Sequence, residues 1–228
     1  IRYFGARLAK LGVEVRLGRH VECADLGNFH HVIVATGIVP RALDVPGIGH
    51  PKVASYADIV SGRRIAGSKV AIIGAGGIGF DVAELLTASS PHDGHASDGH
   101  VDDPAIAQFR EEWGIDADFA ERGGLGEVRE PAPARHVWLL QRKPSKVGEG
   151  LAKTTGWIKR TLLKKRGVKM LAGVEYVRID DAGLHIRVGG QPQVLDVDTI
   201  VVCAGQEPRR DIVDRLRSMG IDHTLVGG

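Results

Sequence analysis

The stretch VAIIGAGGIGFDVAELL, residues 70–86, constrains the fold more than any other part of the sequence. An apolar strand runs into a glycine loop and then a helix, and Gly74, Gly76 and Gly79 stand in G-x-G-x-x-G spacing. In this context the first glycine permits a tight turn, the second lets backbone approach a pyrophosphate, and the third lets the helix pack on the strand. The phosphates would meet free N–H groups at the positive helix end. The pattern predicts a dinucleotide site; a glycine-rich turn used only for packing is the alternative.

The end of the next strand indicates which dinucleotide fits. An NAD site usually places Asp or Glu there, roughly 20 residues past the loop, to accept from the ribose 2′-hydroxyl. Here an insertion predicted over residues 88–133 delays that strand, which ends in LLQRKPSK with no acid. Arg142 and Lys143 instead offer a fork of donors and a second cation, which suit a 2′-phosphate. NADPH is the predicted nucleotide; two solvated charges at a strand end are the alternative.

Composition narrows the function classes. The hydrophobic share of 43% and the charged share of 25% are ordinary for a globular protein, and the formal charge of +2 does not by itself favour nucleic acid. The helix predicted near residues 157–166 has a basic face without an aromatic surface for stacking bases. No run approaches the ~20 apolar residues that span a bilayer. We expect a cytoplasmic protein with no nucleic-acid or membrane partner.

The two cysteines, Cys23 and Cys203, form no C-x-x-C pair and no metal-ligand spacing. Electron transfer would therefore need an organic cofactor. His92, His95 and His100 stand among aspartates in a Gly/Ser-rich stretch and raise the possibility of a metal site. Their loose spacing favours a solvated insertion, so we predict no metal-binding residue.

The order of predicted elements gives the fold class. A helix is expected over residues 3–11, and apolar or alternating segments predict strands at 13–18, 31–37, 69–73, 136–141 and 199–205, with short strands between 168 and 197. This order predicts an α/β fold, with a Rossmann-like nucleotide-binding domain of mostly parallel sheet plus a β-meander. The helical pattern at the first residues and the final Gly-Gly lead us to expect a piece of a larger protein.

Two similar turns flank the glycine loop in sequence. VIVATGIVPR and IVVCAGQEPR each join an apolar strand to small residues, and then to proline and arginine. Small residues at 35–37 and 204–205 let backbone approach a cofactor or a neighbouring strand closely. At these turns the chain resembles the two-dinucleotide flavoprotein reductases. An ordinary turn is the alternative for either one alone.

Further segments carry a more specific resemblance: GAGGIGFD, EEWGID, LLQRKPSKVGEGLAKTTGWIKR, RGVKMLAGV and VVCAGQEPRR. They are similar to the C-terminal part of bacterial NADPH-dependent 2,4-dienoyl-CoA reductases, in the old yellow enzyme-like flavoprotein group. The resemblance implies a larger protein with an N-terminal TIM barrel for FMN and acyl-CoA, a [4Fe–4S] cluster, and a C-terminal FAD and NADPH region. Hydride would pass from NADPH to FAD, and electrons would continue through the cluster and FMN to the dienoyl substrate.

The resemblance also implies residue roles and domains. Gly74, Gly76, Gly77, Ile78 and Gly79 would bind the NADPH diphosphate, Arg142 and Lys143 its 2′-phosphate, and Gly205 and Gln206 would lie near the nicotinamide, while Ala35, Thr36 and Gly37 would border FAD. Residues 1–50 would be part of an FAD-binding domain, 51–208 the NADPH-binding domain, and 209–228 a return to the first. The flavin fingerprint is not in this sequence, so its FAD site is expected to be incomplete. No residue is predicted as catalytic.

Two functions of different classes follow. The first is the NADPH-docking part of a flavin-dependent oxidoreductase, whose partners are NADP(H), FAD and the remaining domains of its parent protein. The second is a non-catalytic NADP(H)-binding or sensor module. A related NAD(P)H:flavin oxidoreductase with a different substrate is a further alternative.

Overall fold

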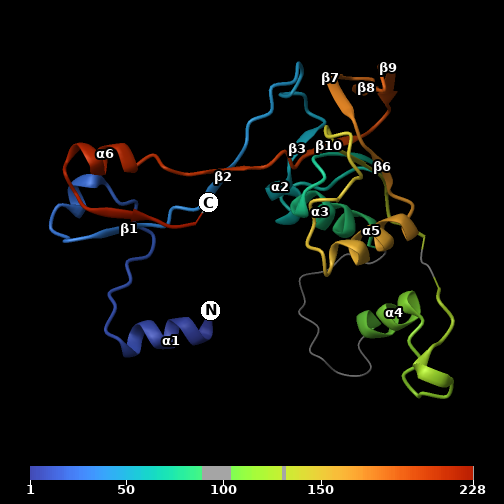
Figure 1. Ribbon diagram of the computed structural model, residues 1–228, viewed down its shortest axis with the longest axis horizontal. Helices are drawn as coiled ribbons and strands as arrows, with labels where there is room; N and C mark the ends of the chain where they lie inside the picture. The colour runs from blue at the N-terminus through green and yellow to red at the C-terminus, as the bar shows by residue number, and fades with distance from the viewer. Residues whose placement is uncertain (89–103, 130–131, 228) are drawn as a thin grey trace. The chain divides into compact units, whose positions relative to one another are not determined.

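The computed structural model describes residues 1–88, 104–129 and 132–227 (Figure 1). The chain divides into two compact units. The smaller consists of Ile1–Val39 and Gln206–Gly228, and the larger of Pro40–Gly205. This division concerns packing alone, so the assignment of cofactors to residues 1–50, 51–208 and 209–228 stays a prediction.

A parallel sheet forms the centre of the larger unit. Its five strands run in the order β3–β10–β4–β5–β6. Their bounds are β3 Val53–Ser55, β10 Thr199–Val202, β4 Lys69–Ile73, β5 His136–Leu140 and β6 Lys169–Leu171. Because the strands are parallel, their carboxyl ends lie at one edge of the sheet, and the loops that follow them are brought together there.

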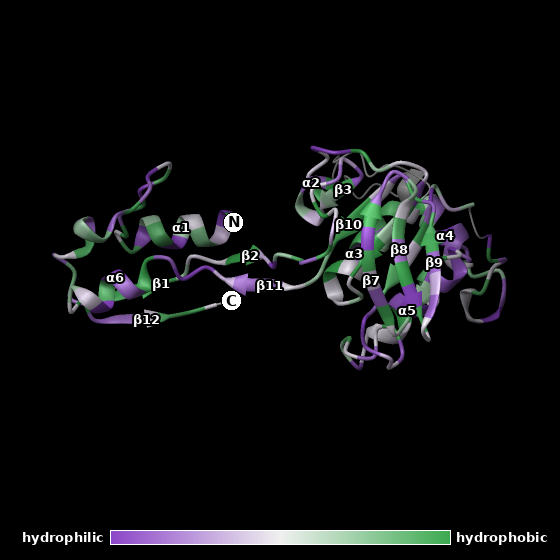
Figure 2. Ribbon diagram, turned by 90° about the horizontal axis from the view of Figure 1, so that it is seen from above, coloured by the Kyte–Doolittle hydropathy of each residue, from purple (hydrophilic) through white to green (hydrophobic). Residues whose placement is uncertain are grey.

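Both faces of this sheet are covered, which explains why its strands are apolar at consecutive positions. The covering elements are helices α2 Tyr56–Val60, α3 Gly77–Thr87 and α5 Gly156–Lys165 on one face, and the antiparallel strands β7 Val174–Asp180, β8 Gly183–Val188 and β9 Gln191–Leu195 on the other (Figure 1). Successive residues of β4 point to opposite faces: Ile72 packs with Phe80, and Ile73 with Leu184. Figure 2 shows the meander strands β7 and β8, which carry both hydrophobic (green) and hydrophilic (purple) residues.

Helix α4, Pro104–Trp113, is fixed to the rest of the larger unit by an ion pair of low exposure. The guanidinium of Arg166, just after α5, donates to both carboxylate oxygens of Glu112 at 2.7 and 3.0 Å and to the backbone carbonyl of Glu84 at 3.2 Å. The side chains of Arg166 and Glu112 are only 13% and 12% exposed. A short 3-10 helix, η2, follows at Arg122–Gly124.

The smaller unit has a core of four buried residues. Its elements are α1 Arg2–Lys10, the 3-10 helix η1 Cys23–Leu26, β1 Val32–Val34, α6 Val213–Ser218 and β12 His223–Leu225. Strand β1 pairs in parallel with β12, and Cys23, Val34, Val213 and Leu216 pack together. Strands β2 Ile38–Pro40 and β11 Gln206–Pro208 form a separate two-stranded sheet.

The predicted fold class is confirmed: the chain is α/β, with a mostly parallel central sheet and an antiparallel meander. The strand predicted at residues 13–18 is wrong. Val13 and Val15 alternate with polar residues but are exposed, and the segment pairs with no strand in the described parts of the chain. Alternation alone does not make a strand, since a strand needs a partner for its backbone groups. Among the helices that the structure describes, none has the length and apolar character needed to cross a membrane.

Candidate functional site

A cavity of about 480 Å³ opens at the carboxyl edge of the parallel sheet. Its lining includes three loops that follow strands of this sheet: Gly74–Gly76 after β4, Gln141–Lys143 after β5, and Cys203–Gly205 after β10. These strands are neighbours in the sheet, with β4 in the middle. Open α/β sheets bind their ligands in the crevice outside the carboxyl ends of the strands, so the cavity lies where this fold places a ligand.

The glycines of the first loop differ in what surrounds them. A Cβ on Gly74 would overlap the backbone carbonyl of Cys203, and one on Gly79 would overlap the carbonyl oxygen of Gly74. Gly74 also has a φ of 110°, which disfavours any other residue. A Cβ on Gly76 or Gly77 would meet no atom within 4 Å. Packing therefore accounts for Gly74 and Gly79, but it gives no reason for glycine at 76 and 77.

Helix α3 begins at this open space. Gly76 is its N-cap and supplies no side-chain hydrogen bond. The amides of the first helical turn have no acceptor within the helix, so they are available to an outside acceptor. Ile78 is half-buried and packs against the core below the loop. Open space beside uncapped amides at a helix N-terminus fits a diphosphate.

Arg142 and Lys143 line the same cavity from the end of β5. Both are exposed, and neither side chain forms a recorded hydrogen bond or ion pair within residues 1–88, 104–129 and 132–227. The turn that carries them is held by the side-chain amide of Gln141, which donates to the carbonyls of Lys143 at 3.1 Å and Ser145 at 2.8 Å. Two cations on a fixed turn are thus available to an anion.

Tyr176 and Glu149 are two of the cavity's polar side chains that were not predicted from the sequence. Tyr176 reaches it from β7, and its hydroxyl donates to the carbonyl of Leu140 at 3.4 Å. Burial raises the pKa of Tyr176 to about 12, although the charge of Arg142 opposes the shift. Glu149 reaches the cavity from the loop before α5. No sequence signal identified either residue, because each lies well beyond the strand end where a nucleotide-binding residue is usually sought.

The loop after β10 closes the other side of the cavity. Gly205 has a φ of 105°, and its carbonyl accepts from the backbone N–H of Arg41 at 3.1 Å. Cys203 is buried, and burial raises the pKa of its thiol to about 12, so it stays protonated at neutral pH. Gln206 begins β11 in the smaller unit and is not among the described residues that line this cavity.

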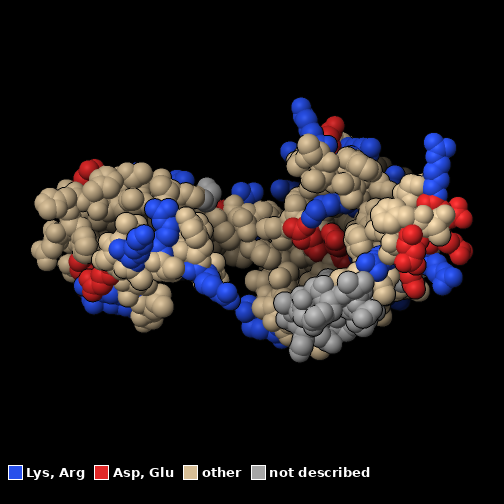
Figure 3. Space-filling view, turned by 90° about the horizontal axis from the view of Figure 1, so that it is seen from below, with Lys and Arg blue, Asp and Glu red and all other residues tan. Residues whose placement is uncertain are grey.

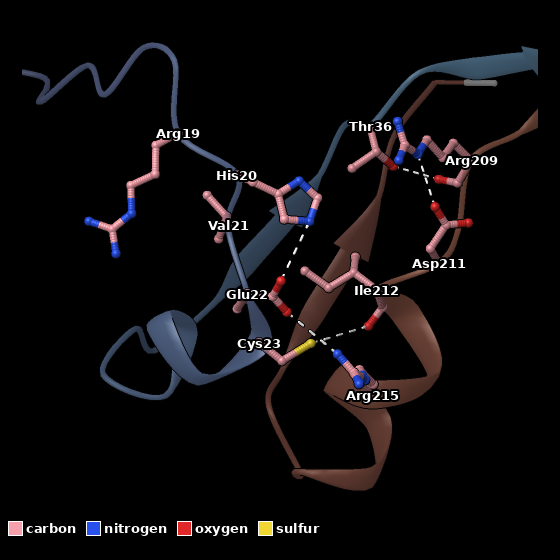
Figure 4. A pocket seen from close by; sticks show the side chains of 10 residues that line it. All are labelled: Arg19, His20, Val21, Glu22, Cys23, Thr36, Arg209, Asp211, Ile212 and Arg215. Carbon is pink, nitrogen blue, oxygen red and sulfur yellow. Dashed lines mark hydrogen bonds and ion pairs between the residues drawn. The ribbon is translucent and has the colours of Figure 1, made fainter.

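A second cavity, of about 610 Å³, lies within the smaller unit (Figure 4). Its lining residues are Arg19, His20, Val21, Glu22, Cys23, Thr36, Arg209, Asp211, Ile212 and Arg215. Figure 4 shows His20 and Arg215 directed at Glu22, with N–O distances of 3.6 and 3.5 Å. The lining combines three arginines with two acids, and each arginine pairs with a carboxylate: Arg19 with Asp25, Arg209 with Asp211 and Arg215 with Glu22.

The turn predicted to border a flavin lies at this second cavity. The hydroxyl of Thr36 donates to the carbonyl of Arg209, and the N–H of Arg209 donates to the carbonyl of Gly37 at 3.0 Å. Thr36 lines the cavity, whereas Ala35 and Gly37 are its exposed chain neighbours. The predicted cofactor residues thus fall into two groups, one in each unit.

No group of three or more His, Cys, Asp or Glu able to hold a metal ion occurs within the described ranges. The histidines at 92, 95 and 100 lie outside them. On the face shown in Figure 3, basic and acidic side chains of the described residues are interspersed rather than gathered in one patch.

The sequence is similar to a known protein family and to individual proteins. A family model described as pyridine nucleotide-disulphide oxidoreductase matches residues 8–226. A metal reductase of Desulforamulus reducens is 23% identical over 209 residues, which cover 88% of this chain and 28% of that protein. A cinnamate reductase of Clostridium sporogenes is 34% identical over 88 residues, which cover 38% of this chain and 13% of that protein.

Solved structures share the fold along nearly the whole chain. A 2-naphthoyl-CoA reductase in complex with 2-naphthoyl-CoA superposes with a TM-score of 0.70 at 18% identity, covering 99% of this chain and 28% of that one. An amine oxidase for 6-hydroxypseudooxynicotine from Pseudomonas geniculata gives 0.62 at 16% identity, covering 99% and 31%. The chain therefore spans less than a third of the length of these relatives.

Proposed function

Since this chain belongs to the pyridine nucleotide-disulphide oxidoreductase family, we propose that the cavity at its sheet edge docks NADPH for hydride transfer to FAD in a flavin-dependent reductase. One observation carries the proposal. The cavity joins an open glycine loop at a helix N-terminus to two cations whose side chains form no hydrogen bond or ion pair with the described residues. These are the two features that a phosphorylated dinucleotide needs.

The glycine loop would hold the diphosphate. Gly76 and Gly77 leave room for its oxygens, and the amides at the start of α3, which have no acceptor within the helix, would donate to them. Gly74 and Gly79 would act indirectly, because they let the loop lie close to β10 and let the helix lie close to the loop. Ile78 would anchor the first turn to the core.

Arg142 and Lys143 would bind the 2′-phosphate. A guanidinium matches two phosphate oxygens with parallel hydrogen bonds, and an ammonium adds a point charge. Hydrogen bonds to charged groups contribute roughly 1.5 to 3 kcal/mol each. The turn fixed by Gln141 presents both cations to the cavity without the cost of separating them from a carboxylate.

The far side of the cavity would receive the nicotinamide half. NADPH supplies a hydride when bound, and the chain's own residues would orient the ring. Gly205 places no side chain on that side of the cavity, and Gln206 follows at the start of β11. The Cys203 thiol and the Tyr176 hydroxyl both stay protonated at neutral pH, so neither brings a negative charge. The roles assigned to 205 and 206 come from the sequence resemblance.

The smaller unit would take part of FAD. Ala35, Thr36 and Gly37 would border it, beside the 610 Å³ cavity that Thr36 lines. We assign residues 1–50 and 209–228 to this flavin-binding part and residues 51–208 to the NADPH-binding part. The flavin fingerprint itself is not in this sequence.

For the final electron acceptor we propose a 2,4-dienoyl-CoA, reached through a [4Fe–4S] cluster and FMN in domains outside this chain. The support is the resemblance of segments such as LLQRKPSKVGEGLAKTTGWIKR to that reductase family. The two curated relatives are named for different acceptors, a metal and cinnamate. A related oxidoreductase with another substrate is therefore the alternative.

The docking role is tested with the protein that carries this chain. Calorimetric titration should give saturable binding of NADP+, and Arg142→Ala should raise the KM for NADPH tenfold or more while changing that for NADH little. Equal losses with both nucleotides would overturn the 2′-phosphate assignment. Absence of binding to the folded protein at millimolar nucleotide would overturn the docking role itself.

A spectrum separates the reductase from a non-catalytic NADP(H) sensor. The purified protein should show flavin absorbance that bleaches when NADPH is added without oxygen. A folded protein that binds NADP+ but is colourless, and stays so after FAD is supplied, would favour the sensor.

A further inference from the structure

Glu149 is an acid in the cavity proposed for NADPH, although the strand that ends in Arg142 and Lys143 offers none. Its side chain is exposed and forms no recorded ion pair or hydrogen bond with the described part of the chain. The cavity lining thus combines two cations with one carboxylate, and Glu149 forms no ion pair with Arg142 or Lys143.

The turn that carries Glu149 is held in place by packing and hydrogen bonds. Arg160 of α5 donates to the carbonyl of Gly148 at 2.8 Å, and the N–H of Glu149 donates to the carbonyl of Lys146 at 3.0 Å. Gly148 has a φ of 74° and is buried, and a Cβ there would lie 2.5 Å from the Phe80 ring. The backbone at 149 is therefore fixed beside the cavity, and the exposed side chain is available to a ligand.

The chemistry of a carboxylate limits which group of a nucleotide Glu149 can bind. An ionised carboxylate only accepts hydrogen bonds, so it suits a ribose hydroxyl and repels a phosphate. In NAD sites an acid accepts from the ribose 2′-hydroxyl, but that acid stands at the end of the second strand. Here Glu149, in the loop before α5, brings such a carboxylate to the cavity from further along the chain.

Resting on the proposed nucleotide site, we propose that Glu149 is a specificity-determining residue that accepts a hydrogen bond from the adenosine 2′-hydroxyl of NAD(H). Arg142 and Lys143 select the phosphorylated nucleotide, and Glu149 supports the unphosphorylated one. The site is then less selective for NADPH than its two cations alone would make it.

The test measures binding directly, by calorimetry with NADP+ and NAD+ on the whole protein. Glu149→Gln keeps the side-chain shape but removes the charge. It should weaken NAD+ binding about tenfold and leave NADP+ binding unchanged or tighter. The Kd for NAD+ divided by the Kd for NADP+ should therefore rise at least tenfold. Arg142→Gln should move the ratio in the opposite direction by weakening NADP+.

Glu127→Gln is the matched control, because Glu127 is exposed, does not line the cavity and pairs only with Arg129 at 3.7 Å among recorded ion pairs. It removes the same charge and should leave both Kd values within twofold. If Glu149→Gln changes the ratio less than twofold, or no more than Glu127→Gln does, the role of Glu149 is refuted while NADP+ binding still supports the docking site. If the folded protein binds neither nucleotide, both proposals fall.

Discussion

Two alanine substitutions in the glycine loop separate packing from phosphate binding. A methyl group on Gly79 would overlap the carbonyl oxygen of Gly74 and lie 3.4 Å from Leu139. The overlap involves backbone, so no rotamer change relieves it. A methyl group on Gly76 meets no atom within 4 Å, and its backbone, with φ −83° and ψ −173°, is allowed for alanine.

The magnitudes follow from these surroundings. Overpacking costs roughly 1 to 3 kcal/mol, and the overlap with backbone places Gly79→Ala at the upper end of that range. The better helix propensity of alanine returns about 1 kcal/mol, so Gly79→Ala should destabilise by about 2 kcal/mol. For Gly76→Ala, a more restricted unfolded chain contributes about 0.4 to 1 kcal/mol. The weaker N-cap offsets that gain, so stability should change by less than about 0.5 kcal/mol. Its methyl group would nevertheless occupy the proposed diphosphate position, and NADP+ affinity should fall at least tenfold, or about 1.4 kcal/mol.

The assay pairs urea unfolding with calorimetric titration of NADP+ for both variants. We expect Gly76→Ala to keep its unfolding midpoint and lose affinity, and Gly79→Ala to lose stability. If Gly76→Ala binds NADP+ as the unaltered protein does, the diphosphate does not lie over this glycine. The loop would then serve packing alone.

Three further results are expected. The Cys203 thiol, with its pKa raised to about 12 by burial, should resist alkylation at pH 8 in the folded protein and react on unfolding, as followed by peptide mass mapping; labelling at the rate of a free thiol would contradict this. Glu112→Ala leaves the nearly buried Arg166 without its carboxylate and should cost about 3 kcal/mol in urea unfolding, and a loss below about 1 kcal/mol would show that the pair is not important for stability. The pKa of Asp198 is held below its usual 3.8 because the backbone N–H of Lys69 and the hydroxyl of Ser68 donate to it. Because the folded pKa is depressed, the ionised carboxylate stabilises the fold above the unfolded pKa, and this stabilisation is lost as the pH falls through the folded pKa. Asp198→Asn should therefore lower Tm at pH 7, and its Tm gap to the unaltered protein should begin to shrink only below about pH 4 and close below the folded pKa of Asp198. A Tm gap independent of pH would contradict this.

Local pattern was a good guide where local geometry decides the structure. The continuous apolar run at β4 predicted a strand, and the glycine spacing predicted a turn into a helix. The alternating segment at residues 13–18 misled, because a strand depends on a partner that no local pattern reveals. The same limit applies to the cavity, whose loops after β4, β5 and β10 are far apart in the chain.

The sequence by itself determined the α/β class, the glycine turn at the start of α3 and the two cations at the end of β5. Each of these depends on residues close together in the chain. Only the tertiary structure decided that β10 lies beside β4, that Tyr176 and Glu149 reach the cavity, and that Gly76 faces open space while Gly79 does not. The physical reason is that strand order and the packing of the meander and the 147–150 turn depend on contacts between distant segments, and these contacts set which side chains share a cavity.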